Sequence, residues 1–301
     1  MSAVGFRHGR AVPYALMCVA VWSLIPGLAS SLKDENLDPY QFLFWSNVVS
    51  ALVLFAVAFA RGEAPRFARY SLRQFSALGA LGALGSFGYY ALLYSAYKDG
   101  DRPTVLVAVQ YTWPVLTVLF SAMLLRERTT ARARTALLLA AAAVALACWS
   151  STSPSPKSIL LTGVAALTFA LYSAWSKLRR DEPYTSLTIV FASGALLSWA
   201  LWIAAGAPSN GVSPRGLAFV FLNGAIINGI SYAWWLEALK RAPAAFLAPW
   251  ISMIPVLGLA GLAFLGHPVG RAQWAGVGLI LMSIYLTSVA PGHQRAPALV
   301  E

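Results

Sequence analysis

The sequence predicts an all-α integral membrane protein with ten transmembrane helices. Of its 301 residues 58% are apolar, 13% aromatic and only 11% charged, whereas soluble domains carry about a quarter charged residues. About 20 apolar residues cross the bilayer core as one helix. Ten stretches without Asp, Glu, Lys or Arg are long enough to do so: residues 11–32, 39–60, 74–97, 103–125, 135–156, 158–176, 183–214, 216–236, 242–270 and 272–294.

The basic residues are distributed unevenly between the two sides of these helices. If the N-terminus is cytoplasmic, 16 of the 22 Lys and Arg residues fall on the cytoplasmic side and 6 on the other. Cytoplasmic connectors are enriched in Lys and Arg, so this split predicts that both termini are cytoplasmic. Topology thereby explains the net charge of +11, and binding to nucleic acid is not expected.

The chain repeats a short motif in its two halves. Pro114-Val115-Leu116 recurs as Pro255-Val256-Leu257, 141 residues later. Five helices per half is an odd number, so the second half would be inverted relative to the first and the two would enclose a central cavity that opens alternately to each side. Chance similarity between Ala- and Leu-rich helices is the alternative. The predicted repeats are residues 1–152 and residues 153–301.

The chemistry that the sequence lacks limits the function. It contains no Gly-x-x-x-x-Gly-Lys-Ser/Thr loop, so ATP is not the direct driver. Every Lys and Arg lies at a helix end or in a connector, so a phosphate-bearing cargo would find no cationic partner. A zwitterionic amino acid suits a chamber of aromatic faces, hydroxyls, amides and helix termini. We therefore expect a secondary transporter whose cargo carries little net charge.

Helical spacing places candidate substrate-binding side chains on a few helices. Ser86, Tyr90, Tyr94 and Tyr97 would form one stripe. The full candidate set is Trp22 and Ser23; Ser86, Tyr90 and Tyr94; Gln110, Tyr111 and Trp113; Tyr172, Trp175 and Ser176; and Asn228, Tyr232 and Trp235. Buried amides need partners, so Gln110 and Asn228 should face the interior or water. Packing against lipid, or an interfacial aromatic belt, is the alternative for the aromatic residues.

Other residues suggest coupling and motion. Glu237 could relay a proton, or it could simply form an interfacial ion pair with Lys240 or Arg241. Pro26, Pro114 and Pro255 interrupt predicted spans and could act as hinges or as fixed kinks. The glycines at every third position, Gly79, Gly82, Gly85 and Gly88, permit close approach of a neighbouring helix. No cofactor or metal site is expected, because the Cys and His residues are not at ligand spacing.

Several segments resemble a known family. Residues 124–128, Leu-Leu-Arg-Glu-Arg, resemble the Leu-Leu-Gly-Glu-Arg end of helix 4 in EamA-type members of the drug/metabolite transporter superfamily. Residues 273–281 are similar to that family's last-helix signature, although His267-Pro268 stands where the family often has Gly-Glu. Within the family, residues 111–120 and 232–235 look most like the YddG-type aromatic amino acid exporters. The resemblance implies export of aromatic and other neutral amino acids.

Two further functions remain as alternatives. The same fold could export drugs, cations or other small metabolites. A membrane-embedded enzyme would need paired Asp, a Ser/His dyad or His/Asp clusters at mid-membrane, and the sequence shows none, so no enzyme activity is expected. The expected partners are a small-molecule cargo and the lipid bilayer, with the oligomeric state left open and a monomer sufficient. The excess of Arg over Lys favours a GC-rich bacterium, hence a bacterial inner membrane.

Overall fold

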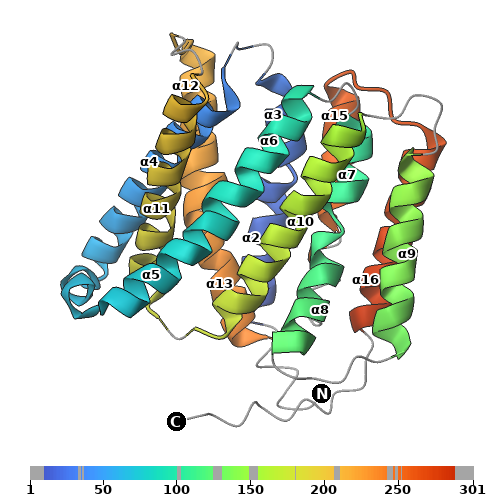
Figure 1. Cartoon of the computed structure of the whole chain (residues 1–301). Helices are drawn as coiled ribbons and strands as arrows, with labels where there is room; N and C mark the ends of the chain where they lie inside the picture. Colours follow the sequence, from blue (N-terminus) through green and yellow to red (C-terminus); the bar gives the residue numbers. More distant parts are fainter. Residues whose placement is uncertain are drawn as a thin grey trace.

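The computed structural model describes residues 10–32, 35, 37–99, 103–124, 131–148, 155–179, 181–206, 211–242, 247, 250–251 and 253–288. Within these residues the secondary structure is helical and no strand occurs. The helices pack side by side in one bundle (Figure 1). In chain order they are α2 (Val12–Trp22), α3 (Ile25–Ser31), α4 (Pro39–Ala60), η1 (Ala64–Arg69), α5 (Leu72–Leu81), η2 (Gly82–Gly88), α6 (Tyr89–Asp99), α7 (Pro103–Gln110), α8 (Trp113–Leu124), α9 (Ala131–Cys148), α10 (Pro156–Lys177), α11 (Pro183–Ala204), α12 (Pro214–Phe221), η3 (Leu222–Ile230), α13 (Ser231–Arg241), α15 (Met253–Phe264) and α16 (Arg271–Ser288).

Seven segments of the described chain are long and apolar enough to cross a membrane. They are Val12–Ser31, Pro39–Ala60, Leu72–Lys98, Pro103–Leu124, Pro156–Lys177, Pro183–Ala204 and Pro214–Arg241. The remaining apolar helices are shorter, and among them α9 packs along α16. The structure therefore confirms a polytopic, all-helical membrane protein, while the expected total of ten crossings stays a prediction.

Two spans are interrupted at prolines, as the sequence predicts. The first breaks between Trp22 and Ile25, so that Pro26 is the second residue of α3. The fourth breaks between Gln110 and Trp113 in the same way, immediately before Pro114. Proline lacks the N–H that would bond to the preceding turn and its ring clashes there, which ends one helix and starts the next. Pro255 lies near the start of α15.

Two spans contain a π-helical stretch that the sequence did not predict. These stretches, η2 and η3, separate α5 from α6 and α12 from α13. In each, the wide turn brings a carbonyl against a glycine five residues later. A Cβ on Gly88 would lie 2.6 Å from the Ala83 oxygen, and a Cβ on Gly229 would lie 2.7 Å from the Gly224 oxygen. Both pairs are 141 residues apart, the offset that also relates Pro114 to Pro255.

The glycines of the third span allow the close approach that their spacing predicts. A Cβ on Gly82 would lie 2.5 Å from the Val190 oxygen of α11, and a Cβ on Gly85 would lie 2.5 Å from Cδ2 of Tyr172. Gly79 differs, because its nearest neighbour, the Ser193 hydroxyl, would be at an ordinary 3.6 Å. Gly82 and Gly85 therefore serve helix packing, as the spacing of the glycines predicts.

The π stretches make reciprocal contacts with two helices that begin and end alike. η2 packs on α11, and η3 packs on α4. Both α4 and α11 are 22 residues long and start with Pro after an acidic N-cap residue, Asp38 or Glu182. Both are followed by a glycine with positive φ, Gly62 at 70° and Gly206 at 57°. Such a glycine is typical of helix ends, where other residues would be strained.

The direction of corresponding helices is opposite in the bundle. In Figure 1, α5 and α6 run from the lower to the upper edge, whereas α12 and α13 run from the upper to the lower edge. α7 and α8 run downwards, while α15 ends at the upper edge.

Candidate functional site

An aromatic cluster lies where helices from both parts of the chain meet. Each ring has a neighbour in the cluster with centroids 4.6 to 6.5 Å apart, in the tilted and edge-on arrangements that aromatic pairs favour. The cluster consists of Trp22, Tyr89, Tyr90, Trp113, Phe169, Tyr172, Tyr232 and Trp235, all of which are buried. The predicted residues of this cluster thus lie in the interior rather than against lipid, and their role in substrate binding stays a prediction. Phe169 and Tyr89 were not predicted.

Trp22 contacts four other rings of this cluster. Its ring centroid lies 5.7 Å from that of Trp235 and 6.2 Å from those of Trp113 and Tyr232. Its indole N–H donates to the Ser231 hydroxyl at 2.8 Å and to the Ile227 oxygen at 3.2 Å. Trp22 ends α2, just before the break at Pro26, so the broken helix presents this side chain to η3.

Several buried polar atoms beside the cluster have no hydrogen-bond partner among the described residues. Asn228 is fully buried, and neither its amide nitrogen nor its oxygen is paired. The same holds for Nε1 of Trp235, Oγ of Ser173 and Nδ2 of Asn223. Buried polar groups are nearly always paired, so each of these atoms is a candidate contact for a polar ligand or water. Asn228 was predicted for this role; Asn223 and Ser173 were not.

A second polar group, missed by sequence reasoning, surrounds the π stretches. The Asn47 amide nitrogen donates to the Ser86 oxygen and to the Ser198 hydroxyl, both at 3.2 Å. The Ser50 hydroxyl donates to the Gly224 oxygen at 2.7 Å. These bonds satisfy carbonyls of η2 and η3, and Asn47 keeps an unpaired Oδ1. The signal that could have found them is the pair Ser46-Asn47, with Ser50 one turn later, in the otherwise apolar α4.

Other predicted residues are buried but already paired. Gln110 lies between two tyrosines: its amide nitrogen donates to Tyr89 at 2.9 Å, and its oxygen accepts from Tyr97 at 3.0 Å. The Tyr94 hydroxyl donates to Oδ1 of Asn223 at 2.8 Å. These bonds make Gln110 and Tyr94 part of the frame that positions the cluster.

The expected single stripe on the third span is divided by η2. Ser86 lies inside the π stretch and donates to the Val190 oxygen of α11 at 2.9 Å. Tyr90 joins the cluster, while Tyr97 faces Gln110 on α7. The prediction assumed one uninterrupted α-helix, and the wider π turn rotates residues before Gly88 relative to those after it.

Four candidates stand at the edge of the cluster or outside it. The Ser23 hydroxyl donates to the Ala20 oxygen of its own helix at 3.0 Å, and the Tyr111 hydroxyl donates to the Trp22 oxygen at 3.3 Å. Trp175 and Ser176 are only half-buried. The structure does not bring Ser23, Trp175 and Ser176 into the ring contacts of the cluster.

Glu237 forms an ion pair, the alternative to a proton relay that the sequence left open. Its carboxylate pairs with the guanidinium of Arg241, one helical turn later and near the end of α13. The Arg241 guanidinium also lies 4.7 Å from the ring centroid of Tyr14, which ties α13 to the start of α2. The pair is partly exposed, so it has the character of an interfacial bridge rather than of a buried relay.

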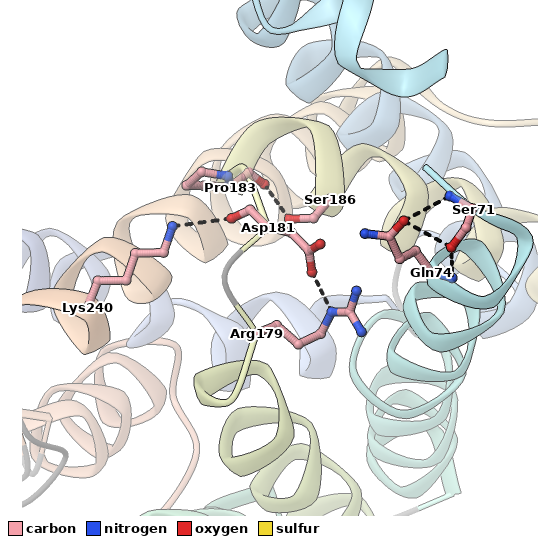
Figure 2. Close-up of polar contacts among 7 residues, drawn as sticks. All are labelled: Ser71, Gln74, Arg179, Asp181, Pro183, Ser186 and Lys240. Carbon is pink, nitrogen blue, oxygen red and sulfur yellow. Dashed lines mark hydrogen bonds and ion pairs between the residues drawn. The ribbon is translucent and has the colours of Figure 1, made fainter. Parts of the chain in front are cut away.

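Polar contacts also link the connectors at this end of the bundle (Figure 2). Arg179 pairs with the carboxylate of Asp181, whose backbone oxygen accepts from Lys240 at 3.4 Å. Figure 2 also shows the capping box of α5, in which Ser71 and Gln74 bond each other's backbone. The α10–α11 connector is thus bonded to the end of α13.

Near these connectors, Tyr70 has a perturbed pKa. It precedes α5 and lies outside the spans. Partial burial, with the Asp181 carboxylate nearby, raises the pKa of its phenol from 10 to about 12. Both effects disfavour the phenolate, so Tyr70 is neutral over the physiological pH range.

An apolar helical bundle with a buried aromatic cluster is typical of a polytopic membrane protein. Comparison with known families names its class. The EamA-like transporter family matches residues 9–149 and, a second time, residues 156–289. The chain belongs to this family of membrane transporters within the drug/metabolite transporter superfamily.

Two known proteins are similar to the chain. An uncharacterized transporter, YwfM of Bacillus subtilis (strain 168), is 24% identical over 224 residues, which is 69% of this chain and 71% of YwfM. A protein of known crystal structure superimposes on this chain with a TM-score of 0.72 and is 22% identical in sequence. The match covers 93% of this chain and 96% of the other protein's chain. This likeness shows a shared fold.

Proposed function

We propose that the chain is a secondary transporter that exports neutral amino acids, especially aromatic ones, like the YddG-type exporters it resembles. It would lie in a bacterial inner membrane with both termini cytoplasmic. Its ten helices would form two inverted five-helix repeats, residues 1–152 and 153–301, that open the central site alternately to each side.

Matched structural features support the inverted repeat. The π stretches η2 and η3, the helices α4 and α11, and Pro114 and Pro255 pair up at offsets of 140 to 144 residues. Corresponding helices run in opposite directions (Figure 1). The family also matches the chain twice. One module used twice with opposite orientation accounts for all three observations.

The unpaired amide of Asn228 is the observation that most favours an amino acid cargo. The unpaired donors Nδ2 of Asn228, Nδ2 of Asn223 and Nε1 of Trp235 could bind a carboxylate. The unpaired oxygens of Asn228 and Ser173 could accept from an ammonium group. The neighbouring aromatic rings would contact an aromatic side chain. Donors, acceptors and ring faces together complement a zwitterion.

Charge supports a cargo without net charge. Among the described residues the buried charged side chains are Asp38 and Glu63, which flank the two ends of α4. A phosphorylated or strongly charged cargo would need a fixed partner in the low-dielectric interior. A cargo without net charge can cross by facilitated movement or by exchange, without an ionised residue inside the membrane. Proton coupling through Glu237 is the weaker option.

The π stretches suggest how the two halves could move. The Tyr232 hydroxyl donates to the Gly85 oxygen of η2 at 3.2 Å, and Trp22 donates to the Ile227 oxygen of η3 at 3.2 Å. Each stretch therefore has a carbonyl bonded by a cluster residue from the other half. Exchange of these bonds, together with bending at Pro26, Pro114 and Pro255, would couple the cargo site to the opening of either side.

Organic cations are the second candidate cargo, because Trp and Tyr faces attract cations. Their recognition would use the rings of Trp22 and Trp235 but would not need the unpaired N–H donors. A transport assay with both amino acids and organic cations distinguishes the two candidate cargoes.

Purified protein in liposomes loaded with unlabelled Trp provides the test. We expect saturable uptake of labelled Trp and Phe, weaker uptake of Thr, and loss of uptake in Asn228→Leu. Counterflow of a labelled aromatic quaternary ammonium ion, without any amino acid counterflow, would instead favour the cation function. No counterflow of either class would reject transport of these cargoes.

A further inference from the structure

A cavity of about 610 Å³ lies on the flank of the bundle, apart from the aromatic cluster. It is formed by the start of α4, the η2–α6 helix, the start of α10 and one residue of α11. Its lining residues are Asp38, Pro39, Tyr40, Phe87, Gly88, Ala91, Leu92, Ser95, Lys98, Lys157, Leu161 and Leu201. We refer to it as the flank cavity. In Figure 1 the last turn of α6 and the first turn of α10 lie at the upper edge, opposite the start of α2.

The flank cavity has apolar walls and a charged end. Phe87, Leu92, Leu161 and Leu201 provide walls without hydrogen-bonding groups. Toward the helix ends lie Asp38, Lys98 and Lys157. The Lys98 ammonium is 3.2 Å from the Asp38 carboxylate, and the Lys98 side chain keeps 49% exposure. The charged residues of the lining are therefore two lysines and one aspartate.

The helix surfaces beside this cavity face the surroundings of the bundle. Leu160, next to the lining residue Leu161, is 66% exposed, and Trp45 on α4 is 42% exposed. In a membrane these apolar surfaces contact acyl chains. An apolar cavity at this place favours an apolar occupant over water.

We propose that the flank cavity binds a phosphatidylglycerol-type lipid, a glycerophospholipid with a net charge of −1. One acyl chain lies along Phe87, Leu92 and Leu161, and the phosphate contacts the ammonium groups of Lys98 and Lys157. Basic residues that close a hydrophobic space between membrane helices are suited to such head groups. This proposal is independent of the cargo.

Native mass spectrometry of the detergent-solubilised protein with added phosphatidylglycerol or phosphatidylethanolamine tests it. We expect phosphatidylglycerol to bind about fivefold or more tightly than phosphatidylethanolamine, which has no net charge. In Lys98→Gln/Lys157→Gln its binding should weaken at least about tenfold, since each lysine near a head group contributes about fivefold. Ala91→Phe, which fills the cavity and leaves its charges intact, should also weaken binding.

Arg215→Gln/Arg271→Gln is the matched control, because it removes two positive charges at the same end of the bundle but outside the lining. Its lipid affinity should stay within about twofold of the parent protein. Equal losses in the two double variants, or equal affinity for both lipids, would overturn the proposal. Thermal unfolding of each variant shows that it folds, and if Ala91→Phe does not fold, the exposed lysine pair decides alone.

Discussion

The indole N–H of Trp22 donates a 2.8 Å hydrogen bond to the hydroxyl of Ser231, 209 residues further along the chain. This bond joins the end of α2 to the start of α13, immediately after η3. It lies where a broken helix, a π stretch and the aromatic cluster meet, so it connects the site to the segments that we expect to move.

Trp22→Phe keeps an aromatic ring in the cluster and removes the N–H. We expect a loss of about 0.5–1.5 kcal/mol in the free energy of unfolding, because one buried hydrogen-bond donor is removed while the Ile227 oxygen keeps its bond from the Ser231 hydroxyl, and a clear fall in Trp counterflow. Trp199→Phe is the control, since Trp199 is 51% exposed on α11. Equal effects of the two substitutions would contradict the role given to Trp22.

Asn228→Leu should separate stability from transport. Its buried amide has no partner, so a similarly sized apolar side chain should leave the free energy of unfolding unchanged or raise it by about 1 kcal/mol, while counterflow is lost. Asn223→Leu is the matched variant, because it removes the acceptor of the Tyr94 hydroxyl and should destabilise the protein by about 1–3 kcal/mol. A destabilised Asn228→Leu with normal transport would show that the amide serves the fold alone.

Gly88→Ala and Gly229→Ala test the π stretches. The added Cβ would meet a carbonyl oxygen at 2.6 or 2.7 Å, so each variant should lose about 1–3 kcal/mol of stability or convert the π turn to α. The second outcome would rotate Tyr90 or Tyr232 out of the cluster and reduce transport. Gly79→Ala, with its nearest neighbour at 3.6 Å, should be nearly neutral; if it behaves like Gly88→Ala, the effect is not specific to the π geometry.

Much of the fold could be predicted from the sequence, because a membrane span depends on one long charge-free stretch and a helix break on one proline. Both signals lie within a short segment of the chain. The breaks before Pro26 and Pro114 needed no knowledge of neighbouring helices. η2 and η3 could not be predicted, since the hydrophobic pattern of a fully apolar span does not distinguish π from α turns. For the same reason the predicted stripe of Ser86 with Tyr97 is divided in the structure.

The interior position of the aromatic side chains could be predicted from the sequence, whereas the pairing of the polar side chains could not; binding of substrate by either group stays a prediction. Trp22, Tyr90, Tyr232 and Trp235 are large side chains at helical spacing, and the fold brings them together. Whether an amide is paired depends on residues far away in the sequence. Asn228 is unpaired, while Gln110 lies between tyrosines of another helix.

Glu237→Gln removes the ion pair with Arg241 and should have little effect on transport. A partly exposed pair contributes about 0–1 kcal/mol, so stability should change little. Counterflow of Trp should proceed equally in the parent protein and the variant, with or without an imposed pH gradient. Accumulation that follows the pH gradient and disappears in Glu237→Gln would establish proton coupling instead.

The inverted arrangement of the two repeats is tested most directly by the sidedness of corresponding connectors. Ala68 and Gly211 are exposed residues just before α5 and α12, the matched helices that lead into the two π stretches. Single cysteines at these positions, in a Cys18→Ala/Cys148→Ala background, are labelled in intact cells with a membrane-impermeant maleimide. We predict that Gly211→Cys reacts from outside and that Ala68→Cys reacts only after permeabilisation; reaction of both from the same side would contradict the inverted repeat.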